Sequence, residues 1–168
     1  RPQYLLARSE AIEEAGADLG YRWYGNRALM SLRLEKGWGA WGLEFRPDFN
    51  AVESGMDAFI NWNKDFVGKE ATQAFKDQGV ERKLVTLTVD TPIDVTLDEA
   101  VLVDGEAVGY ITSGSFAHHV EQSMAMAYVA TPFADAGAKV TVEILGEMYD
   151  AVIMGAPAYD PNGGRMRS

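Results

Sequence analysis

The chain has 168 residues, of which 47% are apolar and 24% charged, an ordinary composition for a globular protein with room for one domain or two small ones. Its formal net charge of -10 disfavours nucleic acid as a partner, because an acidic chain repels a polyanion at long range. Cysteine is absent, which excludes disulfides, thiolate nucleophiles and cysteine-ligated metals.

The sequence also bears on location. No stretch approaches the ~20 consecutive apolar residues that a membrane-spanning helix needs, so we expect no membrane association. The N-terminus lacks the basic and apolar pattern of a secretory signal, and we therefore expect a cytoplasmic protein. The chain begins with Arg1, which we interpret as the result of processing or as a sign that it is a piece of a longer protein.

Two helices are expected at the start of the chain. Apolar residues recur at helical spacing over residues 4–15, and Gly16 is placed to close that helix in a left-handed conformation. A second helix is predicted from Asn26, as its N-cap, to Gly37. Glu35 then lies in the last turn of this helix.

The next part of the chain is less regular. Residues 38–57 are rich in Gly, Trp, Phe and Pro, residues 59–62 are a candidate strand, and a third helix is expected over residues 68–78, ended by Gly79. These elements are too few to close a layered domain, since apolar helix faces would remain uncovered. We therefore expect residues 1–79 to complete a domain whose remainder lies upstream or in another chain.

Short alternating apolar runs follow from Lys83 onwards. Asp104-Gly105 between two of them is a strong signal for a two-residue hairpin turn, because both central positions of a type I′ turn need a positive φ. About six strands suggest a small antiparallel barrel or sandwich. We predict an α+β fold, with a partial α+β domain at residues 1–79 and an antiparallel β-barrel at residues 80–168. The expected strands are residues 84–89, 100–103, 107–112, 124–129, 140–144 and 151–154.

Glu35 is the most informative single residue. A carboxylate in the last turn of a helix opposes the negative end of the helix dipole, at a cost of about 0.3–1 kcal/mol. Such a residue invites a functional explanation. From local sequence alone, a salt bridge to Arg33, Lys36 or Arg46 is the alternative that we favour.

Five short motifs stand in register along the chain. They are Gly-Ala-Asp-Leu-Gly at 16–20, Arg-Leu-Glu-Lys-Gly at 33–37, Phe-Val-Gly-Lys-Glu at 66–70, Thr-Ser-Gly at 112–114 and Ser-Met-Ala-Met-Ala-Tyr-Val at 123–129. Together they resemble the folate-binding region shared by the glycine cleavage T-protein (aminomethyltransferase) and the C-terminal half of dimethylglycine and sarcosine dehydrogenases. The tail, with residues 143–147, Pro157, residues 159–161 and residues 165–167, is more similar to the dehydrogenases.

The resemblance implies a folate site and its residues. Glu35 would accept the two parallel donors of the pterin ring in a fork, and such charge-assisted hydrogen bonds are about twice as strong as neutral ones. Trp38 and Trp41 would supply flat aromatic surface, although Trp41 replaces a tyrosine common in the transferase branch and so lacks its hydroxyl. Lys64 lies where the family carries a basic residue near the glutamate tail. For each tryptophan, and for Lys64, a core or surface role is the alternative.

As an enzyme, the chain would then be the tetrahydrofolate-binding C-terminal part of a demethylating amine oxidoreductase, which captures a one-carbon unit as 5,10-methylenetetrahydrofolate. FAD would be held by the missing upstream part or by a partner chain, because no dinucleotide fingerprint is present. The family's catalytic aspartate lies upstream, so no catalytic residue is assigned. The alternatives are a stand-alone aminomethyltransferase acting with a lipoyl carrier protein, and a non-catalytic scaffold.

Other chemistry is disfavoured. His118 and His119 would point to opposite faces of a strand, and no third ligand stands at a suitable spacing, so no metal site is expected. Ser113 and Ser115 match no nucleophile elbow. The sequence leaves open the methylated amine and the oligomeric state, with a homo-oligomer as one option.

Overall fold

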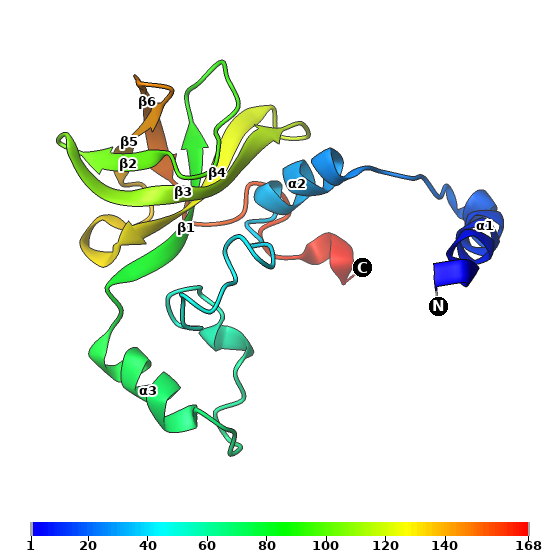
Figure 1. The fold of residues 1–168 in the computed structure, drawn as a ribbon, viewed down its shortest axis with the longest axis horizontal. Helices are drawn as coiled ribbons and strands as arrows, with labels where there is room; N and C mark the ends of the chain where they lie inside the picture. The colour runs from blue at the N-terminus through cyan, green and yellow to red at the C-terminus, as the bar shows by residue number, and fades with distance from the viewer. Residues whose placement is uncertain (1, 168) are drawn as a thin grey trace.

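The computed structural model describes residues 2–167, and it places a barrel beside a group of helices and turns (Figure 1). Helices α1 (Leu5–Gly16), α2 (Asn26–Glu35) and α3 (Lys69–Gln78) all precede the first strand. The chain therefore has the α+β fold expected from its sequence. The strands are β1 (Arg82–Val89), β2 (Ala100–Val103), β3 (Glu106–Ala117), β4 (Gln122–Ala130), β5 (Lys139–Ile144) and β6 (Glu147–Ile153).

The six strands form a closed antiparallel barrel in the order β1-β4-β3-β2-β5-β6, in which β6 pairs with β1. Strands β1 to β5 each contain one of the predicted apolar runs, whereas β6 ends at Ile153 and leaves out Met154, the last residue of the sixth run. Asp104 and Gly105 between β2 and β3 have φ angles of 51° and 83°, which confirms the expected hairpin turn. Apolar side chains such as Leu87, Ile111 and Val142 fill the interior.

Strand β4 is buried along almost its whole length because both of its faces are covered. The small residues Ala125 and Ala127 point into the barrel, where they join the main core. The large residues Met124 and Met126 point outward and form a second cluster with Leu34 of α2. Alternation of small and large side chains therefore makes β4 both a wall of the barrel and the platform on which α2 lies.

Helix α2 ends with Glu35 and is closed, as predicted, by Gly37, whose φ is 63°. The Trp38 N–H donates to the carbonyl of Arg33 and the Gly37 N–H to that of Leu34, both at 2.9 Å. This pair of bonds is a Schellman motif, which needs a residue in the left-handed conformation. The predicted start is wrong by one residue, since Gly25 is the N-cap and makes no side-chain cap bond.

Two further local predictions are wrong. Gly16 has a φ of -93°, and the chain reverses in the left-handed conformation at Gly20 instead, with a φ of 72°. Residues 59–62 do not form a strand, because within residues 2–167 no neighbouring strand lies beside them to pair with. Phe59 instead ends a short 3-10 turn and packs edge-on against Trp38, with ring centroids 5.7 Å apart.

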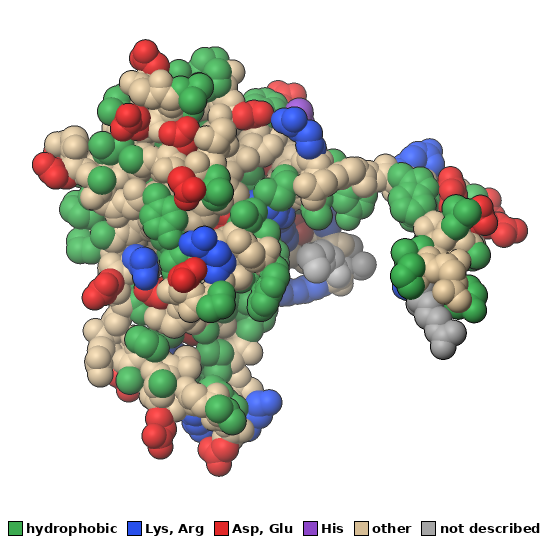
Figure 2. Space-filling model, in the orientation of Figure 1, with side chains coloured by type: hydrophobic (Ala, Val, Ile, Leu, Met, Phe, Trp, Pro, Cys, Tyr) green, Lys and Arg blue, Asp and Glu red, His purple; other side chains and the backbone are tan. Residues whose placement is uncertain are grey.

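Helix α1 stands clear of the rest of the molecule at the end of an extended segment (Figure 1). None of its side chains is buried, and Figure 2 shows apolar side chains spread over its surface. Leu29 and Leu32 on the neighbouring α2 are also about half exposed, at 45% and 51%. The first half of the chain thus has apolar helix faces that nothing in residues 2–167 covers. No helix in that range is long and apolar enough to cross a membrane.

Candidate functional site

Glu35 lies at the junction of α2 and the barrel and is only 2% exposed. Its Oε1 accepts hydrogen bonds from the backbone N–H of His119, at 2.9 Å, and from the hydroxyl of Ser31, at 3.4 Å. Within residues 2–167, Oε2 accepts no hydrogen bond. One carboxylate oxygen is therefore fixed by the protein, and the other is free to accept a donor.

The salt bridge that local sequence favoured for Glu35 is absent from the described residues, so that prediction is wrong. Each of the three candidate cations pairs elsewhere. Arg33 lies 3.2 Å from Glu44, Lys36 lies 3.2 Å from Asp160, and Arg46 lies 3.4 Å from Asp48. None of these three cations therefore competes for the Glu35 carboxylate.

Glu44 forms a buried junction between the segment after α2 and the barrel, and its side chain is 0% exposed. Oε2 accepts from the Arg33 Nη1 at 3.2 Å and from the Ala40 N–H at 2.7 Å. Oε1 accepts from the hydroxyls of Thr112, at 2.7 Å, and Ser113. We call this set the Arg33–Glu44 junction.

A β-bulge makes the junction possible. Neighbouring side chains on a regular strand point to opposite faces. The pairing of β3 with β4 shifts between Ile111 and Ser113, however, so that Thr112 is an extra residue. The bulge turns both hydroxyls toward Glu44, which is a recognised way in which a bulge redirects a side chain.

Burial dominates the electrostatics of Arg33. It lowers the pKa of the guanidinium from its ordinary value, and the Glu44 carboxylate opposes that shift. Arg33 Nη1 also donates to the carbonyl of Trp38 at 3.2 Å. The junction therefore holds the turn that carries Trp38 as well as the helix that carries Glu35.

A second contact fixes the loop that follows. Tyr128 of β4 stacks on Phe49, with ring centroids 3.7 Å apart and the ring planes inclined by 22°. Its hydroxyl donates to the carbonyl of Glu44 at 3.0 Å and lies 2.8 Å from the hydroxyl of Ser54. Burial raises the pKa of Tyr128 to about 12, so the phenol stays protonated and keeps this donor at neutral pH.

Trp38 and Trp41 line one apolar cavity of about 580 Å³, together with Phe45, Phe49 and Met56. Trp38 packs edge-on against Phe45, with centroids 6.1 Å apart, whereas Trp41 is 90% exposed. The structure thus brings these two predicted residues together. Glu35 does not line this cavity, although only the Gly37 turn separates it from Trp38 along the chain.

Lys64, the fourth predicted residue, does not line the cavity that holds Trp38 and Trp41. It is exposed in the turn before α3, and its side chain makes no hydrogen bond or ion pair within residues 2–167. Its ammonium group is therefore available to an external anion, which is also true of many surface lysines.

The segment after the barrel, residues 157–160, returns to the helix that carries Glu35, and we call it the C-terminal brace. The Tyr159 N–H donates to the Glu35 carbonyl at 2.9 Å, and the Tyr159 ring meets that of His119 edge-on at 4.8 Å. Lys36 and Asp160 form an ion pair beside these contacts. The C-terminal brace therefore contacts both the end of α2, at Glu35, and the β3–β4 turn, at His119.

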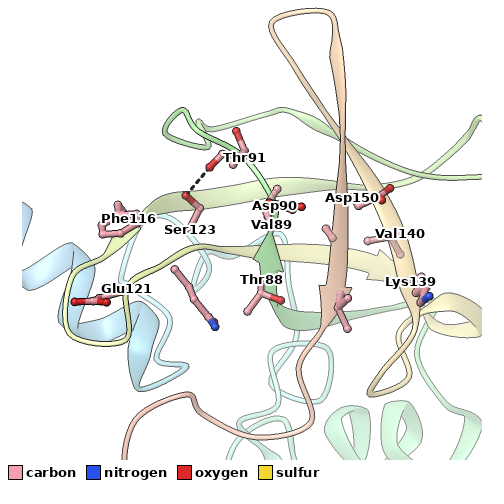
Figure 3. A pocket seen from close by; sticks show the side chains of 13 residues that line it. Thr88, Val89, Asp90, Thr91, Phe116, Glu121, Ser123, Lys139, Val140 and Asp150 are labelled. Atoms are coloured by element: carbon pink, nitrogen blue, oxygen red, sulfur yellow. Dashed lines mark hydrogen bonds between the residues drawn. The ribbon is translucent and has the colours of Figure 1, made fainter.

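Another cavity, of about 590 Å³, opens at one end of the barrel (Figure 3). Asp90, Glu121 and Asp150 line it with Lys139, and a hydrogen bond of 3.4 Å from Ser123 to the Thr91 carbonyl crosses its rim. None of the predicted site residues lines this cavity, so it does not belong to the same site.

Sequence reasoning missed three residues that shape the site, namely Ser31, Glu44 and Tyr128. The contacts of Glu44 with Thr112 and Ser113 span 68 and 69 residues, and no local pattern reports such a pairing. Ser31 carried a usable signal, because residues four apart on a helix share a face and Ser31 precedes Glu35 by four.

Two family models match the chain. That of the GCVT N-terminal domain matches residues 1–64, and that of the glycine cleavage T-protein C-terminal barrel domain matches residues 82–160. The chain belongs to the glycine cleavage T-protein family. The resemblance drawn from the five motifs is thereby confirmed.

Members of this family that resemble the chain include human mitochondrial dimethylglycine dehydrogenase, which is 41% identical over 160 residues, or 94% of this chain. An aminomethyltransferase of a Picosynechococcus strain is 38% identical over 144 residues, or 84% of this chain. The chain spans 18% of the first protein and 40% of the second.

The fold agrees with that of a solved family member. The crystal structure of glycine cleavage system aminomethyltransferase T from Bartonella henselae matches with a TM-score of 0.84 and 25% identity. The match covers 93% of this chain and 44% of that one.

Proposed function

We propose that this chain is the tetrahydrofolate-binding C-terminal part of a demethylating amine oxidoreductase similar to dimethylglycine or sarcosine dehydrogenase. Family membership supports one-carbon chemistry that depends on folate. The observation that carries the proposal is the free Oε2 of Glu35, on a side chain whose other oxygen is fixed by Ser31 and His119.

The residues present fit a reduced pteridine. A carboxylate oxygen without a partner suits the ring's N–H donors, and a charge-assisted bond of this kind is among the stronger hydrogen bonds in proteins. Trp38 and Trp41 offer aromatic faces on the adjacent cavity, and the exposed Lys64 offers a cation for the glutamate tail. When bound, tetrahydrofolate supplies a nucleophilic nitrogen that takes up the one-carbon unit to give 5,10-methylenetetrahydrofolate.

In this role the chain binds and orients rather than transfers protons. Glu35 fixes the position of the pteridine, and the aromatic side chains keep water from one of its faces. Both effects favour capture, because orientation removes part of the entropic barrier and exclusion of water suppresses hydrolysis of a reactive one-carbon donor. No general acid or base is assigned within residues 2–167.

The proposed partner is an upstream half of the same protein or a separate subunit. The exposed faces of α1 and α2 support it, since Leu5, Leu6, Leu29 and Leu32 are all at least 45% exposed. FAD would be bound there. The division into a partial folate domain at residues 1–79 and a barrel at residues 80–168 belongs to this proposal, as does a cytoplasmic location, although the human relative is mitochondrial by name.

The decisive experiment replaces Glu35 by Gln in the native protein and measures tetrahydrofolate affinity by calorimetric titration. The amide oxygen of Gln can still accept from Ser31 and His119, so the fold should be unaffected. The amide N–H₂ would replace Oε2, and we expect affinity to fall by about 1.5–3 kcal/mol, the value of a hydrogen bond to a charged group.

Glu106→Gln is the matched control. Glu106 is exposed at the start of β3, and its replacement changes the net charge by the same amount as Glu35→Gln does. If Glu35→Gln binds tetrahydrofolate as tightly as this control does, Glu35 only ties α2 to the barrel and the scaffold alternative is correct. The stand-alone aminomethyltransferase remains the alternative within enzymes. A flavin absorbance spectrum in the native protein separates it from the proposed oxidoreductase.

A further inference from the structure

One hydroxyl joins α2 to the barrel next to Glu35, the carboxylate that we propose binds folate. Ser31 is 3% exposed, and its Oγ accepts a hydrogen bond from the backbone N–H of His118 at 3.0 Å. The same hydroxyl donates to Glu35 Oε1 at 3.4 Å. The next amide of the β3–β4 turn, that of His119, donates to Oε1 directly at 2.9 Å.

These hydrogen bonds give the two oxygens of the Glu35 carboxylate different roles. Each oxygen of an ionised carboxylate has about two acceptor sites. Oε1 receives two donors and is saturated, whereas Oε2 receives none within residues 2–167. The fork expected from the sequence, with one ligand donor on each oxygen, therefore conflicts with the hydrogen bonds that already occupy Oε1.

We propose that Ser31 is a positioning residue for Glu35, which with the two amides of the β3–β4 turn holds Oε1 and directs Oε2 alone toward the donor groups of a reduced pteridine. This inference rests on the proposed function and specifies how the barrel takes part in it. The barrel does not touch the ligand through Ser31. It sets the rotation of the carboxylate that does.

The chemistry of the side chain at position 31 is restrictive. The hydroxyl must accept from one group and donate to another, which serine and threonine can do and alanine and valine cannot. Threonine and valine have nearly the same shape and are both β-branched, so they cost similar amounts in a helix. Their comparison isolates the hydroxyl from the volume and the helix propensity of the side chain.

The experiment measures tetrahydrofolate dissociation constants for Ser31→Thr and Ser31→Val in the native protein, each with Glu35 and with Glu35→Gln. We expect Val to bind about three- to tenfold more weakly than Thr when Glu35 is present, the value of one neutral hydrogen bond. In the Glu35→Gln background the difference should shrink to less than about twofold, because Ser31 then has no charged oxygen to direct.

The outcomes are distinct. An equal loss in both backgrounds would show that position 31 acts on the fold and not through Glu35, which overturns the inference and leaves the proposed function intact. An unchanged affinity in Glu35→Gln alone overturns the proposed function itself. Thermal unfolding of each variant confirms that it is folded, and Ser31→Ala against Ser31→Thr repeats the comparison should valine prevent folding.

Discussion

Removing the Glu44 carboxylate should destabilise the protein more than any change at its surface. In Glu44→Ala, Arg33 would keep a buried charge with a side chain only 7% exposed. Loss of one partner of a buried ion pair costs about 3–5 kcal/mol. Thr112 would still donate to the Met126 carbonyl at 3.1 Å, but Ser113 would lose its acceptor, at a further cost of about 1 kcal/mol.

Urea unfolding of the native protein, followed by circular dichroism and tryptophan fluorescence, measures this loss. The expected total of about 4–6 kcal/mol is comparable to the whole stability of many domains, about 5–15 kcal/mol. Glu44→Gln should lie between wild type and Glu44→Ala, because the amide oxygen still accepts hydrogen bonds while the charge of Arg33 is left uncompensated.

The double variant Arg33→Met with Glu44→Leu is the control, since replacing both members of a buried pair by apolar residues is often neutral or stabilising. We expect it to recover at least half of the loss. A cost below about 1 kcal/mol for Glu44→Ala would refute the reasoning, because it would mean that the Arg33 charge is already solvated.

The remaining predictions concern the C-terminal brace and the aromatic cavity. Burial acts to raise the pKa of Asp160, but Lys36 and the amides of Gly164 and Arg165 outweigh it and hold that pKa below the ordinary value. A lowered folded-state pKa adds stability above the unfolded value of about 3.9, and this stability is lost as the pH falls through the folded value. Asp160→Asn should therefore lower the melting temperature at neutral pH and match wild type in strong acid; a gap that persists in acid contradicts this. Trp41→Ala should leave the melting temperature nearly unchanged, since Trp41 is 90% exposed, yet weaken tetrahydrofolate binding by about 0.5–1.5 kcal/mol in calorimetry. Equal affinities would place Trp41 outside the site.

Local sequence signals were sufficient to predict those features that depend only on neighbouring residues, such as helix ends and tight turns. Gly37 ends α2 because the Schellman bonds need a left-handed residue, and Asp104-Gly105 forms the hairpin turn because both positions need a positive φ. The alternation in β4 likewise marks a strand. Gly16 misled the prediction, because Gly20, only four residues later, has the same conformational freedom and is the one that the chain uses.

The site was predicted only in part, because its geometry depends on contacts between distant segments. The sequence pointed to Glu35 through its unfavourable place at a helix end, but the shorter of its two hydrogen bonds comes from the β3–β4 turn, where His119 lies 84 residues away. Arg33 could not be assigned to Glu44 rather than Glu35 without the fold. The bulge at Thr112 was equally hidden, since a single extra residue changes no apolar pattern.

The C-terminal brace has a consequence for how the protein is made. Lys36 and Asp160 are 124 residues apart along the chain. Closing so long a loop has an entropic cost, and contacts between residues so distant in sequence form slowly during folding. A ribosome completes the Glu35 helix well before it synthesises the segment that grips the helix. In the nascent polypeptide Glu35 therefore lacks its His119 partner until the β3–β4 turn has been made, and the proposed folate site can form only in chains whose barrel has already folded.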